Sequence, residues 1–254
     1  MIFIRKFERL DPKETFVLTD FDRTLTEHDS STCWGLLEES PYIDQGYAKE
    51  SLNIYHYYRP IEVDQTIPFV DKSVIMEKWF REVALLLSKY HIYEETIEKI
   101  FMNSNGLKLR KDVKPFLGRM NELGIPVVIV SAGIGNFIEK YLASEGCLFD
   151  NVTIHSNYLI YEGGRIVGVK EPILHSLNKS MLTYPEISSK RKGLLFGDQI
   201  EDKEMGRHVD TISVGFCDTN MHSLKEFKRE FDVVLTGDSS YEQVAKTYIK
   251  RYKK

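Results

Sequence analysis

The chain has 254 residues, of which 42% are hydrophobic and 28% are charged, and its formal net charge is −4. These values are typical of a globular protein with one large domain, or with a core domain and a smaller one. The slightly acidic balance excludes a general electrostatic attraction to nucleic acid or to an anionic membrane, and no apolar run has the length of a transmembrane helix.

The cysteines and the first residues of the chain indicate the cellular compartment in which the protein resides. Cys33, Cys147 and Cys217 are odd in number and far apart, which is typical of free thiols rather than of a disulfide framework or a zinc site. Residues 1–9 carry charges where a signal peptide would have its apolar segment. We therefore expect a cytoplasmic protein, a monomer, that binds neither nucleic acid nor membrane.

Short apolar and β-branched runs alternate with helix-like stretches along most of the chain. Strands are predicted at residues 16–19, 127–130, 152–155, 194–196, 212–216 and 233–235, and helices at 111–123, 135–145, 201–207 and 239–250. A hairpin is predicted where residues 158–160 and 165–169 flank two glycines. Strands that alternate with helices predict an α/β fold with a parallel sheet covered on both faces.

The interval 34–110 breaks this alternation. Apolar side chains at spacings of three and four predict one long helix over residues 75–90, and a second helix-like run covers 93–103. The stretch 51–60 is rich in aromatic residues and has no clear period.

These boundaries predict two domains. Residues 1–33 and 111–254 would form the core, and residues 34–110 would form a mainly helical insertion. An insertion after the first strand would lie above the carboxyl ends of the strands, where ligands bind in open α/β sheets. We therefore expect the insertion to act as a lid, or cap.

The most informative segment is Asp20-Phe21-Asp22-Arg23-Thr24, directly after the first predicted strand. Two carboxylates at a spacing of two point roughly the same way, because side chains alternate along an extended chain. One carboxylate can attack a substrate while the other transfers a proton, and both can approach one cation. An ordinary acidic loop is the alternative that this segment alone leaves open.

Two more strand ends carry polar residues. Ser131 and Ala132 follow the strand at 127–130 and precede a helix-like run, an arrangement that suits an anion because backbone N–H groups converge there. A tight turn would explain the same residues. Asp198 and Asp202 follow the strand at 194–196 and could ligate Mg²⁺, although acidic residues also cap helices.

Lys179 lies between these two segments, near the end of a helix-like stretch. Most lysines are solvated surface residues, so Lys179 carries little information alone. In order, however, the chain has a strand-end Asp-x-Asp, a strand-end Ser, a Lys and a strand-end Gly-Asp-x-x-x-Asp. This order closely resembles the haloacid dehalogenase-like (HAD) superfamily of phosphotransferases.

Within that superfamily the chain resembles the pyrimidine 5′-nucleotidase family, of the cytosolic 5′-nucleotidase III type. The likeness is carried by the segments 19–26, 58–64, 76–80, 131–135 and 154–157. It implies a Rossmann-like core with a helical cap inserted after the first motif, Mg²⁺ as cofactor, and hydrolysis of nucleoside monophosphates to nucleosides.

The resemblance also implies roles for single residues. Asp20 would be the nucleophile and Asp22 the acid and base, and Lys179 would join them in catalysis. The phosphoryl group would be bound by Ser131, Ala132 and Lys179. The Mg²⁺ site would be formed by Asp20, Asp22 through its backbone carbonyl, Asp198 and Asp202. Lys170 is a weaker candidate for the lysine of the motif.

In the cap, Glu62 matches a residue that contacts the nucleoside in the family. Trp79 and Phe80 could stack on a base, and packing within the cap is the alternative, which is favoured for Trp79. Val83 appears where the family has a substrate-binding serine, and it cannot donate a hydrogen bond. Because of this departure, and because the residues of segment 197–202 are bulkier and more acidic than is usual in the family, the resemblance leaves open which nucleoside is released.

The sequence thus predicts a Mg²⁺-dependent phosphomonoester hydrolase, a 5′-nucleotidase that prefers pyrimidine nucleotides and acts through an aspartyl-phosphate. One alternative is a phosphatase of the same superfamily that acts on a phosphosugar or on phosphoserine. Another is a phospho-acceptor module without turnover, which would not need an acid and base at Asp22.

Overall fold

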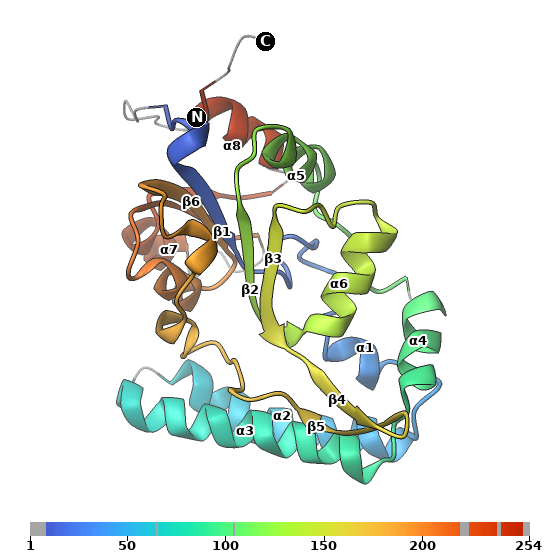
Figure 1. Ribbon diagram of the computed structural model, residues 1–254. Coiled ribbons are helices and arrows are strands. Elements are labelled where there is room, and N and C mark those ends of the chain that lie inside the picture. Colours follow the sequence, from blue (N-terminus) through green and yellow to red (C-terminus); the bar gives the residue numbers. More distant parts are fainter. Residues whose placement is uncertain (1–8, 65, 104, 219–223, 238–239, 251–254) are drawn as a thin grey trace.

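The computed structural model describes residues 9–64, 66–103, 105–218, 224–237 and 240–250 (Figure 1). The predicted core segment 1–33 and the predicted helix 239–250 therefore both begin outside the described residues. The helix itself is α8 (Tyr241–Tyr248). Within the described residues, no helix is long and apolar enough to cross a bilayer.

Six parallel strands form the central sheet, in the order β3-β2-β1-β6-β7-β8. Their bounds are β1 (Thr15–Thr19), β2 (Val127–Ile134), β3 (Val152–Asn157), β6 (Lys192–Gly197), β7 (Thr211–Phe216) and β8 (Val233–Leu235). The predicted α/β fold with a parallel sheet is confirmed, and each predicted strand lies in one of these six.

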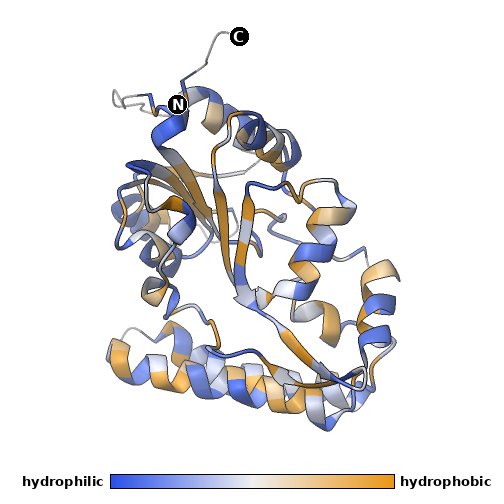
Figure 2. Ribbon diagram, viewed as in Figure 1, coloured by the Kyte–Doolittle hydropathy of each residue, from blue (hydrophilic) through white to orange (hydrophobic). Residues whose placement is uncertain are grey.

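Helices cover the sheet on both faces because successive side chains of each strand point to opposite sides. Val17 packs in a cluster with residues of α5 (Val113–Glu122), α6 (Gly135–Ser144) and α8. Phe16 and Leu18 pack in a second cluster, with residues of η3 (Pro185–Ile187), η4 (Ile200–Gly206) and α7 (Leu224–Glu230). Figure 2 shows β2 as largely hydrophobic, whereas β3, at the edge of the sheet, is mixed.

Within the predicted core, three elements differ from the sequence-based expectations. The segment 201–207 forms a 3₁₀ helix, η4, rather than an α-helix. Helix α5 begins at Val113, because Asp112 has a left-handed backbone with φ of 63°. Strand β2 continues past Val130 to Ile134, and its register with β3 shifts between these two residues, so that Ser131 lies within an irregular strand end and not in a turn beyond it.

The interval 34–110 is helical, as expected from the sequence. It contains α1 (Gly35–Glu38), α2 (Gln45–Val63), α3 (Phe69–Lys89) and α4 (Glu94–Asn103). The aromatic stretch 51–60, which has no clear period, is part of α2, and Pro60 lies in the last turn of this helix. Helices α2 and α3 pack side by side below the sheet in Figure 1.

The predicted hairpin is present as β4 (Leu159–Glu162) and β5 (Arg165–Val169), and it lies along α3 (Figure 1). Arg165 donates from Nη2 to the carbonyl of Ser88 at 2.9 Å. The backbone N–H of Glu94 donates to the carbonyl of Gly164 at 2.7 Å. The hairpin therefore carries the chain from the sheet to the helical insertion before it returns toward Lys179.

Candidate active site

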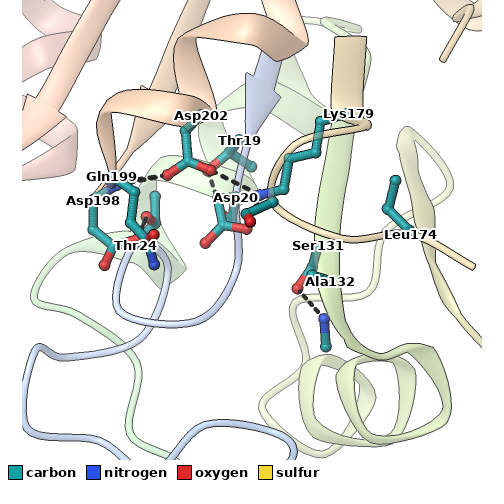
Figure 3. A network of polar contacts seen from close by, with 12 residues as sticks. Thr19, Asp20, Thr24, Ser131, Ala132, Leu174, Lys179, Asp198, Gln199 and Asp202 are labelled. Carbon is teal, nitrogen blue, oxygen red and sulfur yellow. Dashed lines mark hydrogen bonds and ion pairs between the residues drawn. The ribbon is translucent and has the colours of Figure 1, made fainter. Parts of the chain in front are cut away.

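The polar residues that the sequence predicts for the site lie together at the carboxyl edge of the sheet, around Asp20 (Figure 3). Strands β2 and β3 extend the sheet on one side of β1, and β6, β7 and β8 extend it on the other. The carboxyl end of β1 is therefore the switch point at which open α/β sheets leave a crevice. Asp20 directly follows β1, and its N–H donates to the carbonyl of Phe196 at 3.0 Å, which fixes it beside the end of β6.

Lys179 is the cation at the centre of this group. It is 3% exposed, and its Nζ lies 2.7 Å from Asp20 Oδ1 and 2.7 Å from Asp202 Oδ1. Burial alone would lower the pKa of Lys179, but the attraction of the two carboxylates outweighs it and raises the pKa. Lys170, the weaker sequence candidate, is exposed just after β5.

Asp202 holds together the turn that follows β6. Its Oδ2 accepts the backbone N–H of Asp198 at 3.1 Å and that of Gln199 at 3.0 Å, while its Oδ1 faces Lys179. A Cβ at Gly197 would lie 2.3 Å from the Cβ of Asp202, so this turn requires a glycine. Asp202 therefore fixes the position of Asp198 and links it to Lys179.

The negative charge in this pocket exceeds the positive charge that the protein supplies. Asp20, Asp198 and Asp202 each offer an oxygen atom, and these atoms lie within 4.8 Å of one another. Burial raises the pKa of Asp20 to about 7 despite the opposing effect of Lys179. Burial and the other two carboxylates raise the pKa of Asp198 as well. A buried set of oxygen ligands with excess negative charge fits a divalent cation such as Mg²⁺.

Asp22 lies beside the end of β2, the segment that carries Ser131. Its Oδ1 accepts the backbone N–H of Cys33 at 3.1 Å, and a Cβ at Gly133 would lie 3.0 Å from its Oδ2. Burial raises the pKa of Asp22 to about 6, although the N–H of Cys33 opposes the shift. A carboxyl group that titrates near neutral pH can both donate and accept a proton.

Ser131 is 1% exposed and belongs to the same edge of the sheet (Figure 3). Its Oγ accepts the N–H of Gly133 at 3.0 Å, which leaves the hydroxyl proton available to a ligand. The neighbouring carbonyl of Ala132 accepts Trp34 Nε1 and Asn157 Nδ2, each at 2.9 Å. Binding of a phosphoryl group by Ser131 and Ala132 stays a prediction.

Arg110 supports the loop after β1, a role that the sequence did not indicate. Its Nε donates to the carbonyl of Thr24 at 3.0 Å, its Nη2 donates to the carbonyl of Arg23, and its Nη1 pairs with Asp218 at 2.6 Å. The hydroxyl of Tyr241 also donates to the carbonyl of Thr24, at 3.0 Å. These partners are far apart in the sequence, and no local pattern relates them.

A cavity of about 260 Å³ opens beside Asp198. Its wall combines residues that follow β1 and β6 with residues of α2, including Arg23, Asp198, Glu201, Arg59 and Glu62. Glu62 is ion-paired with Arg59. Glu62 and Asp198 thus line the same cavity, and contact of Glu62 with a nucleoside stays a prediction.

Trp79 and Phe80 of α3 pack against other aromatic rings. Trp79 stacks on Tyr58, with ring centroids 5.6 Å apart and an interplanar angle of 9°. Phe80 contacts Trp34 edge to face at 6.1 Å and lies 6.2 Å from the ring of His175. Neither Trp79 nor Phe80 lines the cavity beside Asp198, and stacking of Phe80 on a base stays a prediction. Val83 is buried, 9% exposed.

Comparison with known proteins identifies the family. The model of the pyrimidine 5′-nucleotidase (UMPH-1) family matches residues 17–251. The chain belongs to this family. The pyrimidine 5′-nucleotidase resemblance seen in the sequence is therefore confirmed, and the chain is a phosphoric monoester hydrolase with a HAD-like fold.

Curated relatives and solved structures are similar to this chain over most of its length. The 7-methylguanosine phosphate-specific 5′-nucleotidase of Drosophila melanogaster is 27% identical, over 93% of this chain and 80% of the relative. The crystal structure of cytosolic 5′-nucleotidase IIIB bound to cytidine has a TM-score of 0.82 and 25% identity, over 93% of this chain and 85% of the other. A phosphoserine phosphatase structure, 16% identical with a TM-score of 0.59 over 96% of this chain and 100% of the other, shares the fold.

Proposed function

We propose that this chain is a Mg²⁺-dependent 5′-nucleotidase that converts nucleoside monophosphates, pyrimidine nucleotides preferentially, to nucleoside and phosphate. The observation that carries the proposal is the buried group at the end of β1, where Lys179 lies 2.7 Å from Asp20 beside two further carboxylates. We also propose that the protein is cytoplasmic and monomeric and binds neither nucleic acid nor membrane.

The Mg²⁺ site in this proposal consists of the carboxylates of Asp20 and Asp198, the backbone carbonyl of Asp22 and the supporting carboxylate of Asp202. When bound, Mg²⁺ supplies positive charge that neutralises phosphate oxygens and offsets the repulsion between a phosphate dianion and a carboxylate nucleophile.

In the first step, a carboxylate oxygen of Asp20 attacks phosphorus and the bond from phosphorus to the nucleoside 5′-oxygen breaks. Lys179 and the hydroxyl of Ser131, with the backbone at Ala132, hold the phosphoryl oxygens. Asp22 gives its proton to the leaving 5′-oxygen. The products are a nucleoside and an aspartyl-phosphate on Asp20.

In the second step, the ionised carboxylate of Asp22 accepts a proton from a water molecule as that water attacks the aspartyl-phosphate. Phosphate leaves and Asp20 is regenerated. A pKa of Asp22 of about 6, raised by burial, supports both roles, because such a group changes protonation state readily near neutral pH.

Residues 34–110 act as the cap in this proposal, on a core of residues 1–33 and 111–254. The cap excludes bulk water during both steps and contacts the leaving nucleoside through Glu62 and Phe80. The position of Glu62 in the wall of the cavity beside Asp198 supports this role for Glu62.

The experiment is a substrate panel. The purified chain with Mg²⁺ is given cytidine and uridine monophosphates, purine monophosphates, 7-methylguanosine monophosphate, phosphoserine and a phosphosugar, and kcat/KM is measured for each. We expect the pyrimidine nucleotides to give the highest values. A preference for 7-methylguanosine monophosphate is the second candidate, because the Drosophila relative is named for that specificity.

Two results would contradict the proposal. A higher kcat/KM for phosphoserine or the phosphosugar than for every nucleotide would move the chain to another branch of the HAD superfamily. Incorporation of phosphate without release would make the protein a phospho-acceptor module. The presence of Asp22 two residues after Asp20 argues against the second result.

A further inference from the structure

The carboxylate of Glu62 is held by the core of the protein as well as by its own helix. Ser176, in the loop that precedes Lys179, donates its hydroxyl to Glu62 Oε1 at 2.7 Å. Arg59, one turn earlier on α2, pairs with Oε2. We propose that Ser176 is a positioning residue for substrate specificity, which orients Glu62 toward the nucleoside. The inference rests on the proposed nucleotidase function.

The loop that carries Ser176 is rigidly tied to the sheet. Asn157, at the end of β3, accepts the N–H of Leu174 and donates to its carbonyl, both at 2.8 Å. Asn178 accepts the N–H of His175 and donates to the carbonyl of Ile173, also both at 2.8 Å. A donor on such a loop has little freedom to follow a moving partner, so Ser176 fixes Glu62 relative to the sheet.

The same loop docks into the insertion. Leu177 is buried in a cluster with Tyr58 of α2 and Met76 of α3. Lys72 of α3 donates from its Nζ to the backbone carbonyl of Glu62 at 3.1 Å. The backbone of Glu62 is therefore held by the insertion, and its side chain spans the boundary between insertion and core.

The contacts of Glu62 leave it able to bind a ligand. Its side chain is 13% exposed and borders the cavity beside Asp198. Each carboxylate oxygen can accept two hydrogen bonds, and Ser176 and Arg59 occupy one position on each oxygen. The remaining positions can accept O–H or N–H donors of a nucleoside. A neutral donor such as Ser176 orients the carboxylate without cancelling its charge.

Helix α3 lacks a hydroxyl at position 83, where the family resemblance expects one. Val83 stands where the family resemblance expects a substrate-binding serine, and its side chain is buried and cannot donate. The hydroxyl of Ser176, which donates to Glu62, belongs to the core loop. The chain thus supplies a hydroxyl beside Glu62 from a segment outside the cap.

The test compares Ser176→Ala and Ser176→Thr with the wild-type protein. The substrates are the best nucleoside monophosphate of the panel and p-nitrophenyl phosphate, which has no nucleoside. For Ser176→Ala we expect the ratio of the two kcat/KM values to fall roughly tenfold, mainly through KM for the nucleotide, as for a lost hydrogen bond to a charged group. Ser176→Thr, which keeps the hydroxyl, should restore most of this ratio.

Two further variants separate specificity from folding. Ser188→Ala removes an exposed serine hydroxyl that donates to the carbonyl of Pro185 in the same turn, at 2.8 Å, and should keep the wild-type ratio. In a Glu62→Gln background, Ser176→Ala should have much less effect than in the wild type, because Ser176 acts through Glu62. This double comparison holds even where a single variant is less stable.

The outcomes distinguish the two proposals. If the wild type prefers nucleotides and Ser176→Ala keeps that preference, or lowers both kcat/KM values equally, the role of Ser176 is refuted while the nucleotidase proposal stands. If the wild type shows no preference for any nucleotide over p-nitrophenyl phosphate, both proposals are refuted.

Discussion

Replacement of Asp202 by asparagine should disrupt the turn after β6 with little change in volume. The carboxylate of Asp202 is 4% exposed and accepts two backbone N–H groups on one oxygen and the ammonium of Lys179 on the other. An amide has one NH₂ group, which must face either the two N–H groups or the ammonium. Either orientation places donor against donor and leaves a buried polar group unsatisfied.

We expect Asp202→Asn to lower the free energy of unfolding by about 2–3 kcal/mol, the cost of leaving a buried polar group unsatisfied, while Lys179 keeps Asp20 as its ionic partner. The matched control is Glu204→Gln on the same short helix, where the carboxylate is exposed and lies 3.6 Å from Arg207. The control should change the free energy by less than ~0.5 kcal/mol.

The assay is equilibrium urea unfolding of wild type, Asp202→Asn and Glu204→Gln, followed by the fluorescence of Trp34 and Trp79. Turnover of Asp202→Asn should also fall, because Asp198 and Lys179 both lose a fixed partner. Unfolding free energies of the two variants within about 1 kcal/mol of each other would refute the role given to Asp202.

Three further predictions follow from the same contacts. Burial lowers the pKa of His175 to about 4, so unfolding takes up a proton below pH about 6.5, and the free energy of unfolding falls by about 3 kcal/mol between pH about 6.5 and about 4. His175→Asn should remove most of this fall, which urea unfolding at several pH values measures. Gly197→Ala should lower the free energy of unfolding by at least about 1–3 kcal/mol and remove most turnover, since its Cβ would lie 2.3 Å from the Cβ of Asp202. The control Gly168→Ala, whose Cβ would point into open space, should change neither quantity. Chelation should abolish turnover reversibly, and added Mg²⁺ should raise the urea midpoint.

The strands and their polar ends could be predicted because a buried strand needs an apolar run and a parallel sheet gathers its carboxyl ends at one edge. This explains why Asp20 and Asp198 were found together. Lys179 belongs to no strand end, and Lys170 has the same place in the order of motifs, between Ser131 and Asp198. The structure separates them, because Lys179 is buried against Asp20 and Lys170 is exposed.

Helix α2 shows where periodicity fails. Its stretch 51–60 places aromatic residues on several sides, and its proline is normally a sign of interruption. The helix is stabilised by tertiary contacts such as the stacking of Tyr58 on Trp79, and local sequence does not encode such contacts.

The supporting contacts of the site could not be predicted for the same reason. Arg110 reaches the carbonyl of Thr24 across 86 positions of sequence, and Ser176 reaches Glu62 across 114. A single arginine or serine in a loop has no pattern that names its partner. Such residues become visible only when the fold brings distant segments together.

The central claim, that Asp20 is the nucleophile, is tested most directly by trapping the phosphorylated enzyme. The chain is mixed with Mg²⁺ and a nucleoside monophosphate labelled at phosphorus, quenched in acid within the first turnover and digested. The account predicts a base-labile phosphoryl group on the peptide that contains Asp20, lost in Asp20→Asn together with phosphate release. Normal turnover by Asp20→Asn, or label on another residue, would contradict it.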